Sequence, residues 1–158
     1  MRAAFAKYTL CLGAALIALS PIAAAQDLKT YAKKGDYEEV KFELSDAIIR
    51  RGLAIDYTGQ LNKMLERTGA DVGSSKQIYR NAEFFMFCSA KFSRDMMEAD
   101  PANIGYCPYV VFVYEAAATP GEIVVGYRRP PRNREGQSER ALAAIDQLLD
   151  GIIKDAVK

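Results

Sequence analysis

The sequence predicts an α+β domain, a two-layer sandwich in which helices pack mainly on one face of a mixed β-sheet of about four to five strands. Amphipathic stretches with helical spacing alternate with short apolar runs typical of strands. A Pro-Gly pair then separates the last two runs, which indicates a hairpin, and a long amphipathic stretch closes the chain. Helices gathered on one face of a sheet are the usual arrangement for such an order. Strands joined through one helix are usually parallel, so a mixed sheet is expected.

The first 25 residues have the layout of a secretory signal peptide. Arg2 and Lys7 precede an apolar run over 10–19, and the small residues at 23–25 form an A-x-A-like cleavage site. The alternative is a transmembrane anchor, but the apolar run is shorter than the ~20 residues that a bilayer needs. We therefore expect cleavage after Ala25 and a periplasmic or secreted protein.

Removing 25 of the 158 residues leaves 133, which is the length of one ordinary domain. We expect a linker or edge strand over residues 26–35 and a single α+β domain over 36–158. Loss of Arg2 and Lys7 leaves 19 basic against 20 acidic side chains, so no general attraction to nucleic acid is expected. Cys11 leaves with the signal peptide, because it lies in the apolar run without the small preceding residue of a lipidation site.

The chain contains no histidine. This excludes a Ser-His-Asp triad, an HExxH zinc site and histidine-ligated haem. No glycine-rich phosphate loop follows a strand either, since Gly69 and Gly73 form only an isolated pair in a turn. No spacing of carboxylates marks an acid–base pair, and we assign no catalytic residue, no cofactor and no metal ligand.

The first predicted strand is an edge strand over Leu28–Ala32. Asp36 and Glu39 then form a capping-box pattern at the start of a helix that Gly52 ends. The spacing of three and four residues predicts that the buried face of this helix holds Tyr37, Val40, Leu44, Ala47 and Ile48.

A short strand is predicted over Leu53–Tyr57, and Thr58 is the expected cap of a second helix. That helix would end at Gly69. Its inward residues would be Leu61, Met64 and Leu65.

The run Glu83–Cys88 is apolar on both faces and predicts a central strand. Ser89 is the expected cap of a short helix that Asp100 and Pro101 end. The run Tyr109–Tyr114 predicts a second fully buried strand.

The turn at Pro120 and Gly121 makes Ile123–Tyr127 the hairpin partner of that strand. Two prolines within 128–134 indicate a basic loop. Ser138 is the expected cap of the last helix, whose buried stripe would hold Leu142, Ile145, Leu149, Ile152 and Ala156.

Two stretches resemble a known family. They are Phe87-Cys88-Ser89-Ala90 and the run from Pro108 to Glu115, with Asp100-Pro101 closing the helix between them. The chain is similar, over roughly 36–131, to the bacterial family named domain of unknown function 302. The resemblance implies a small α+β domain that often dimerises, and it implies no activity. Cys88 matches the family's first cysteine, whereas Tyr109 occupies the place of the second, with Cys107 on the other side of Pro108.

Cys88 and Cys107 allow three interpretations. A disulfide is favoured by an oxidising compartment and would contribute ~3 kcal/mol by closing a loop of 18 residues. If the two strands are parallel, however, the cysteines lie at opposite ends of the sheet, ~20 Å apart and beyond the ~7 Å limit for a bridge. The alternatives are free structural thiols and a reactive Cys88 at a helix N-terminus. This group of candidate binding residues also includes Ser89, directly after Cys88, Arg94 on the helix that follows, and Cys107.

Four methionines, Met64, Met86, Met96 and Met97, together with Cys88 raise the hypothesis of a copper(I) site. Core packing is the favoured interpretation, because Met64 and Met86 lie on apolar faces and Met96 occupies a core position of its helix.

A second group of candidate binding residues gathers at the hairpin and the basic loop. These are Tyr109, Tyr127, Arg128 and Arg129, with Tyr106, Tyr114, Arg132 and Arg134 close by in sequence. Tyrosine and arginine are enriched at binding surfaces, and such a cluster could hold an acidic protein or an anionic small molecule. The alternative is a solvated loop beside core tyrosines.

The sequence therefore favours an exported, non-enzymatic binding or interaction module that forms a homodimer and uses the tyrosine–arginine surface or an open sheet edge. The alternative is a thiol-redox or soft-metal accessory protein centred on Cys88. A Cys88→Ser variant would separate the two, because only the second function needs the thiol.

Overall fold

The computed structural model describes residues 28–132 and 134–158, so the expected signal peptide lies outside the described residues. The described chain forms β1 (Leu28–Lys34), α1 (Tyr37–Ile49), β2 (Ile55–Gln60), α2 (Leu61–Thr68), β3 (Tyr79–Phe87), α3 (Ala90–Ala99), the 3-10 helix η1 (Pro101–Tyr106), β4 (Tyr109–Ala116), β5 (Glu122–Arg128) and α4 (Gly136–Ala156). The predicted α+β class and the helix-rich connections are confirmed.

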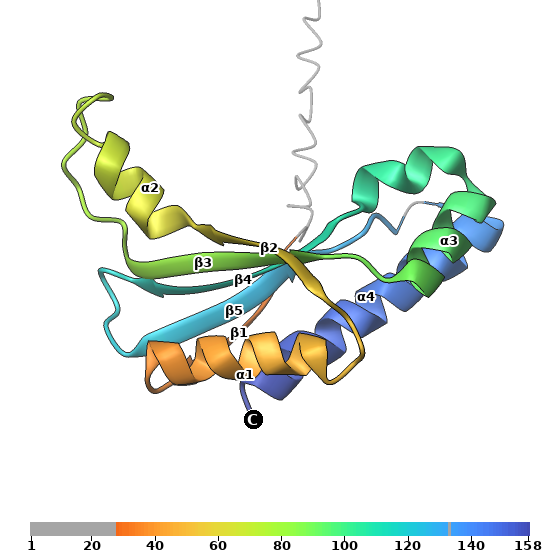
Figure 1. The fold of residues 1–158 in the computed structure, drawn as a ribbon, viewed down its shortest axis with the longest axis horizontal. Helices are drawn as coiled ribbons and strands as arrows, with labels where there is room; N and C mark the ends of the chain where they lie inside the picture. Colours follow the sequence, from red (N-terminus) through yellow and green to blue (C-terminus); the bar gives the residue numbers. More distant parts are fainter. Residues whose placement is uncertain (1–27, 133) are drawn as a thin grey trace, which may run out of the picture.

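The five strands form one sheet in the order β1-β5-β4-β3-β2, and every neighbouring pair is antiparallel. The expectation of a mixed sheet is therefore wrong. The reason lies in two connections that leave one end of the sheet and return to the same end. We call them the α2 excursion (residues 61–78) and the α3–η1 excursion (residues 88–108). Each one takes the place of a hairpin turn, at opposite ends of β3 (Figure 1).

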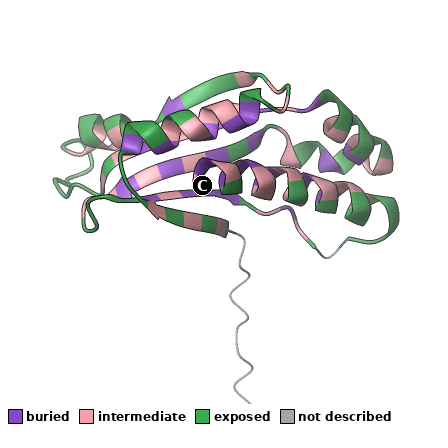
Figure 2. Cartoon of the chain, turned by 90° about the horizontal axis from the view of Figure 1, so that it is seen from below, coloured by how far each residue is buried: buried purple, intermediate pink, exposed green. Residues whose placement is uncertain are grey.

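The helices α1 and α4 lie side by side against one face of the sheet (Figures 1 and 2). The predicted stripes of both helices are buried, and they pack against alternate residues of the central strands, which are Phe85, Phe87, Tyr109, Val111, Val113, Ile123, Val125 and Tyr127. Because successive side chains of a strand point to opposite faces, these residues define the covered face.

We call the opposite side of the sheet the open face. Its members are Thr30, Ala32, Tyr57, Gly59, Ala82, Phe84, Met86, Val110, Phe112, Tyr114, Val124 and Gly126. In the described part of the chain, α2 and η1 stand at its two ends and no helix crosses its middle (Figure 1). Tyr57 of the edge strand β2 is 57% exposed and Val110 of β4 is 38% exposed. The other open-face residues of the central strands are half-buried, except Ala82 and Gly126, which are buried. The expectation that the two central strands are buried on both faces is therefore wrong within this chain.

Element boundaries follow the predicted caps in part. Asp36 caps α1 as expected, since its Oδ1 accepts a hydrogen bond from the Glu39 N–H at 3.0 Å. Gly52 has a φ of 72°, the left-handed conformation expected just past a helix. Ser89 occupies the N-cap position of α3, but its side chain makes no capping bond.

Two predicted caps are wrong. Thr58 lies within β2, opposite Phe85 of β3, because pairing with the neighbouring strand continues to Gln60. Ser138 lies in the first turn of α4, and its hydroxyl instead accepts a hydrogen bond from the Asn103 amide at 2.8 Å. Among the residues that the structure describes, no helix combines the length and apolarity needed to cross a membrane.

Candidate functional site

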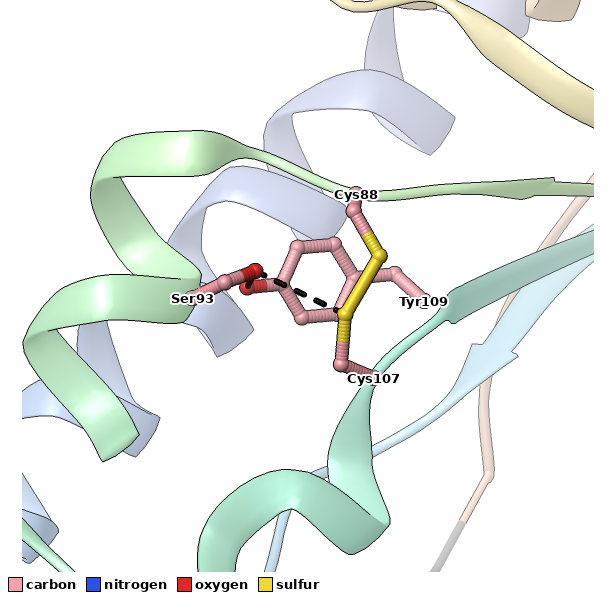
Figure 3. Close-up of a disulfide and its surroundings, with 4 residues drawn as sticks. All are labelled: Cys88, Ser93, Cys107 and Tyr109. Atoms are coloured by element: carbon pink, nitrogen blue, oxygen red, sulfur yellow. Dashed lines mark hydrogen bonds between the residues drawn. A yellow bond between two sulfur atoms is a disulfide. The ribbon is translucent and has the colours of Figure 1, made fainter. Parts of the chain in front are cut away.

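The two cysteines lie at the same end of the sheet. Cys88 directly follows β3 and Cys107 shortly precedes β4, and the neighbouring residues Phe87 and Tyr109 are opposite each other in the ladder. The two Cα atoms are 6.4 Å apart and the sulfurs form a disulfide (Figure 3). The separation of ~20 Å expected for parallel strands is wrong, because the strands are antiparallel. Of the three interpretations of Cys88 and Cys107, the structure agrees with the disulfide.

The surroundings of the disulfide are those of a packed core. The Ser93 hydroxyl lies 3.5 Å from the Cys107 Sγ and 3.2 Å from the Tyr109 hydroxyl (Figure 3). Tyr109 is buried, and its ring meets Phe87 edge-on with centroids 5.9 Å apart. Burial raises the pKa of Tyr109, against the opposing effect of the Ser93 hydrogen bond. Tyr109 therefore packs the covered face at the base of the α3–η1 excursion.

A second cluster surrounds Asp146 of α4. Its carboxylate accepts hydrogen bonds from the Tyr127 hydroxyl at 2.6 Å and from Arg129 Nη2 at 2.7 Å. Arg132 adds a third contact at 3.1 Å. Burial, followed by the hydrogen bond to Asp146, raises the pKa of Tyr127, and the same carboxylate raises the pKa of Arg129. Two candidate binding residues are thus engaged inside the molecule, where they fix the end of β5 to α4.

Asp146 was not among the sequence candidates. A signal for it exists, because an acidic residue at 146 continues the spacing of Leu142, Ile145 and Leu149 on the buried stripe of a helix. A carboxylate placed there needs a partner, since an unpaired buried charge is costly. The basic residues that follow β5 supply it.

Asp150, one turn further along α4, holds the edge strand β1 in the same way. Burial alone would raise its pKa, but hydrogen bonds from Lys154, Lys29 and Tyr31 outweigh burial and lower the pKa to about 2. Lys29 Nζ lies 2.8 Å from the carboxylate and the Tyr31 hydroxyl lies 3.0 Å from it. Two successive turns of α4 therefore hold both β5 and β1.

The remaining candidates do not converge on one site. Tyr106, Tyr109, Arg128 and Arg129 line a shallow hollow of about 170 Å³ at the end of β5. Arg94 lies elsewhere, exposed on α3 beside Glu98 at 3.3 Å. The hollow is smaller than the ~300 Å³ at which small-molecule pockets begin. Of its two arginines only Arg128 is exposed, so a ligand in this hollow would meet one accessible guanidinium.

Within residues 28–132 and 134–158, no group of three or more acidic or cysteine side chains could hold a metal ion. The copper(I) hypothesis also lacks a converging sulfur set. Met96 is buried in the core and Met64 is exposed on the α2 excursion at the other end of β3. Cys88 is bonded to Cys107.

The open face is a larger surface than any of these clusters. A Cβ atom at Gly59 would collide with the Phe84 ring, and one at Gly126 would collide with the Phe112 ring, so each ring reaches over a glycine of the neighbouring strand. The Tyr57 ring lies near the Phe84 ring, tilted against it, with centroids 6.0 Å apart. Aromatic side chains therefore gather on the open face.

Charged side chains on this side of the sheet lie at its rim. Residues 122, 124, 126 and 128 of β5 share the face because side chains alternate, and only the two end residues, Glu122 and Arg128, are charged. Lys34 stands opposite Glu122 in the ladder with β1. An apolar centre with a charged rim is the usual anatomy of a protein–protein interface.

The fold and these surfaces define a class: a small α+β domain with a five-stranded antiparallel sheet, two helices on one face and an aromatic open face on the other. A family model described as "Domain of unknown function DUF302" matches residues 29–156, and the chain belongs to that family. The resemblance expected from the cysteine and strand motifs is thereby confirmed.

A solved structure has the same fold. The crystal structure of an uncharacterized conserved DUF302 protein from Bacillus stearothermophilus is 12% identical to this chain. The match covers 84% of this chain and 99% of that one, with a TM-score of 0.68. No curated protein matches the chain.

Proposed function

We propose that this protein is an exported binding module without a catalytic centre of its own, and that it works by holding another protein surface against the open face. Export is supported by the leader-like first 25 residues. Binding through the sheet is supported by one observation above all. The central strands carry apolar side chains on both faces, while helices of the described chain cover only one of them.

The open face differs from the solvent-exposed face of an ordinary antiparallel sheet. An antiparallel sheet with one face in water normally alternates between apolar residues inside and polar residues outside. In β4 the outward positions are Val110, Phe112 and Tyr114, and in β3 they include Phe84 and Met86. Monomeric proteins rarely expose contiguous apolar patches above a few hundred Å². A second protein surface on this face would remove the patch from water.

The alternative functions have less support. A thiol or soft-metal function centred on Cys88 would first require reduction of its bond to Cys107. An anionic partner at the tyrosine–arginine cluster would compete with Asp146 for Arg129. Arg128, in contrast, is exposed and belongs to the rim of the open face.

Site-specific photocrosslinking in the producing cells tests the proposal. A photoreactive phenylalanine analogue at Val110 or Thr30 points from the open face, and the matched control at Glu39 points from the exposed side of α1. We expect light-dependent protein adducts from the first two positions and none from Glu39. Absence of adducts from both open-face positions, in exported and folded protein, would overturn the proposed function.

A further inference from the structure

We propose that the groove between α2 and the returning segment 75–80 binds an extended peptide of another protein, and that this peptide carries an acidic side chain. The peptide adds a strand beside the segment, in the place that β2 leaves empty where the chain turns into α2. Strand addition is a common mode of peptide recognition, in which backbone hydrogen bonds provide affinity and side-chain pockets provide specificity. The site lies on the α2 excursion and the start of β3, so this inference goes beyond the proposed use of the open face.

The groove has the size of a ligand site. Its volume is about 580 Å³, which is within the ~300–1,000 Å³ typical of ligand pockets and well above the volume of the hollow at the end of β5. One wall is α2 and the other is the segment that returns to β3. The walls meet at the tip of the excursion, where the Ser74 N–H donates to the Gly69 carbonyl at 2.8 Å. A Cβ atom at Gly69 would lie only 2.5 Å from the Ser74 carbonyl oxygen, so glycine permits this closure.

The start of β3 has an open edge on the side of the groove. Pairing between β2 and β3 ends at Gln60 and Glu83, whereas β3 stays paired with β4 as far as Tyr79. The first residues of β3 therefore have a neighbouring strand on one side only. The Arg80 carbonyl faces α2, since the Asn62 amide donates to it at 3.5 Å. An unpaired strand edge of this kind is a template for another chain.

The segment before β3 continues this edge. Within the described chain, residues 75–77 make no hydrogen bond with another backbone group. The Ile78 carbonyl accepts a hydrogen bond from the Ala117 N–H at 3.0 Å, on the side of β4. Because the backbone groups of successive residues in an extended chain point to opposite sides, the Gln77 N–H faces the groove. A peptide beside residues 75–80, about 20 Å long, would pair with these groups.

The side chains that line the groove indicate which peptide fits. Lys76 and Arg80 supply two positive charges, against one negative charge from Glu66. Leu65 and Ile78 supply apolar surface, and Ile78 is 50% exposed. Charge complementarity therefore favours an acidic residue in the peptide, with apolar residues beside it.

Peptide selection tests the site and its charge preference. A phage-displayed library of random peptides is selected on the exported, disulfide-bonded chain, and synthetic copies of enriched peptides are measured by fluorescence polarisation. We expect enriched peptides to contain Asp or Glu. Lys76→Glu should raise their dissociation constant about tenfold or more, because attraction to the acidic residue becomes repulsion. Lys63→Glu, an exposed reversal on α2 outside the groove, is the matched control and should leave the dissociation constant unchanged.

A backbone variant and hydrogen exchange test the strand addition. Gln77→Pro removes an N–H that makes no backbone hydrogen bond within the described chain, and it should raise the dissociation constant about fivefold. Gln77→Ala keeps the N–H and is the matched control. Bound peptide should slow amide exchange in residues 75–80 and leave exchange in β1 unchanged. Circular dichroism confirms that each variant is folded.

The outcomes separate this site from the open face. Selection that enriches no peptide on the folded chain overturns the inference, and so do peptides that bind Lys76→Glu as tightly as the wild-type chain. Equal binding to Gln77→Pro and Gln77→Ala overturns strand addition. Peptides that slow exchange in β4 instead overturn the groove but support the proposed function. Binding in the groove without photocrosslinks from the open face overturns only the proposed function.

Discussion

The two helical excursions occupy equivalent places in the topology, but the α3–η1 excursion is packed much more firmly against the rest of the domain than the α2 excursion. Each one joins antiparallel neighbours at one end of β3 (Figure 1). The α3–η1 excursion is closed by the disulfide and buries Met96 and Asn103 completely. The α2 excursion buries no residue of its helix, and Val72 near its tip is 74% exposed. Its helix begins directly after β2, without a side-chain cap.

The difference shows that a helix between two strands does not by itself imply a parallel crossover. A crossover helix must pack along a face of the sheet, and the covered face is already occupied by α1 and α4. The helices α2 and α3 are short, at 8 and 10 residues; α2 follows β2 and lies over one end of β3, and α3 stands beyond the other end of the sheet (Figure 1). One of them is then fixed to α4, and the other is left with few contacts. Local stability should therefore differ strongly between the excursions.

The largest expected effect comes from Met96, the core anchor of the α3–η1 excursion. Met96→Ala removes a fully buried side chain and should lower the free energy of unfolding by about 2–5 kcal/mol. Urea unfolding measures the loss. Met64→Ala on the α2 excursion is the matched control, and a change within about 0.5 kcal/mol is expected because Met64 is 40% exposed. Equal losses would show that the two excursions are anchored alike.

The second largest loss of unfolding free energy should come from removing the disulfide. The double variant Cys88→Ser and Cys107→Ser frees the loop in the unfolded chain and should lower the free energy of unfolding by about 3 kcal/mol. Thermal and urea unfolding with and without a thiol reductant measure it. The reductant should destabilise the wild-type chain to the level of the variant and leave the variant itself unchanged. A reductant effect on the variant would mean that something other than the disulfide responds.

A smaller difference in stability between the two excursions is expected at their asparagines, Asn103 and Asn62. The Asn103 amide donates to the Met96 carbonyl at 2.8 Å and to the Ser138 hydroxyl at 2.8 Å, which ties η1 to α3 and α4. Asn103→Ala should cost about 1–2 kcal/mol, because the Met96 carbonyl keeps the Asp100 N–H as a donor. The matched residue on the other excursion is Asn62, whose amide reaches the Arg80 carbonyl at 3.5 Å on the surface.

Asn62→Ala should change the free energy of unfolding by no more than about 0.5 kcal/mol. The two variants are compared by urea unfolding under identical conditions. A cost at Asn62 as large as that at Asn103 would contradict the difference in anchoring.

Much of the fold follows from periodicity. The stripes of α1 and α4 are set by the 3.6-residue repeat, and the cap at Asp36 and the turn at Gly121 use local chemistry, so short stretches of sequence contain the necessary information. Strand direction does not follow in this way. It depends on whether a helix packs on the sheet or beyond its end, which is a property of the whole chain. The predicted separation of Cys88 and Cys107 was wrong for the same reason, because it assumed that the two strands are parallel.

The candidate site was less predictable for a related reason. The sequence grouped Tyr127, Arg128 and Arg129 as candidate binding residues, but it did not place Asp146 of α4 against two of them. Similarly, apolar residues on both faces of β4 predicted a strand buried on both sides. Such a pattern states only that both faces favour burial, and it does not say whether the cover comes from the same chain. The open face is the part of this pattern that the described chain leaves uncovered.

Proteolytic cleavage within the α2 excursion should have only a small effect on the free energy of unfolding. Trypsin cleaves after lysine and arginine, and both excursions carry such residues: Lys63, Arg67 and Lys76 in one, Lys91 and Arg94 in the other. Cleavage requires local unfolding, so the poorly anchored segment should be cut first. Mass spectrometry should find early products cut after Lys76 or Arg67, with Lys91 and Arg94 intact until the disulfide is reduced. Because β2 and β3 stay paired beside the cut, the nicked chain should unfold within about 1 kcal/mol of the intact one. Early cleavage after Lys91 in the oxidised chain would reverse the order of stability inferred for the two excursions.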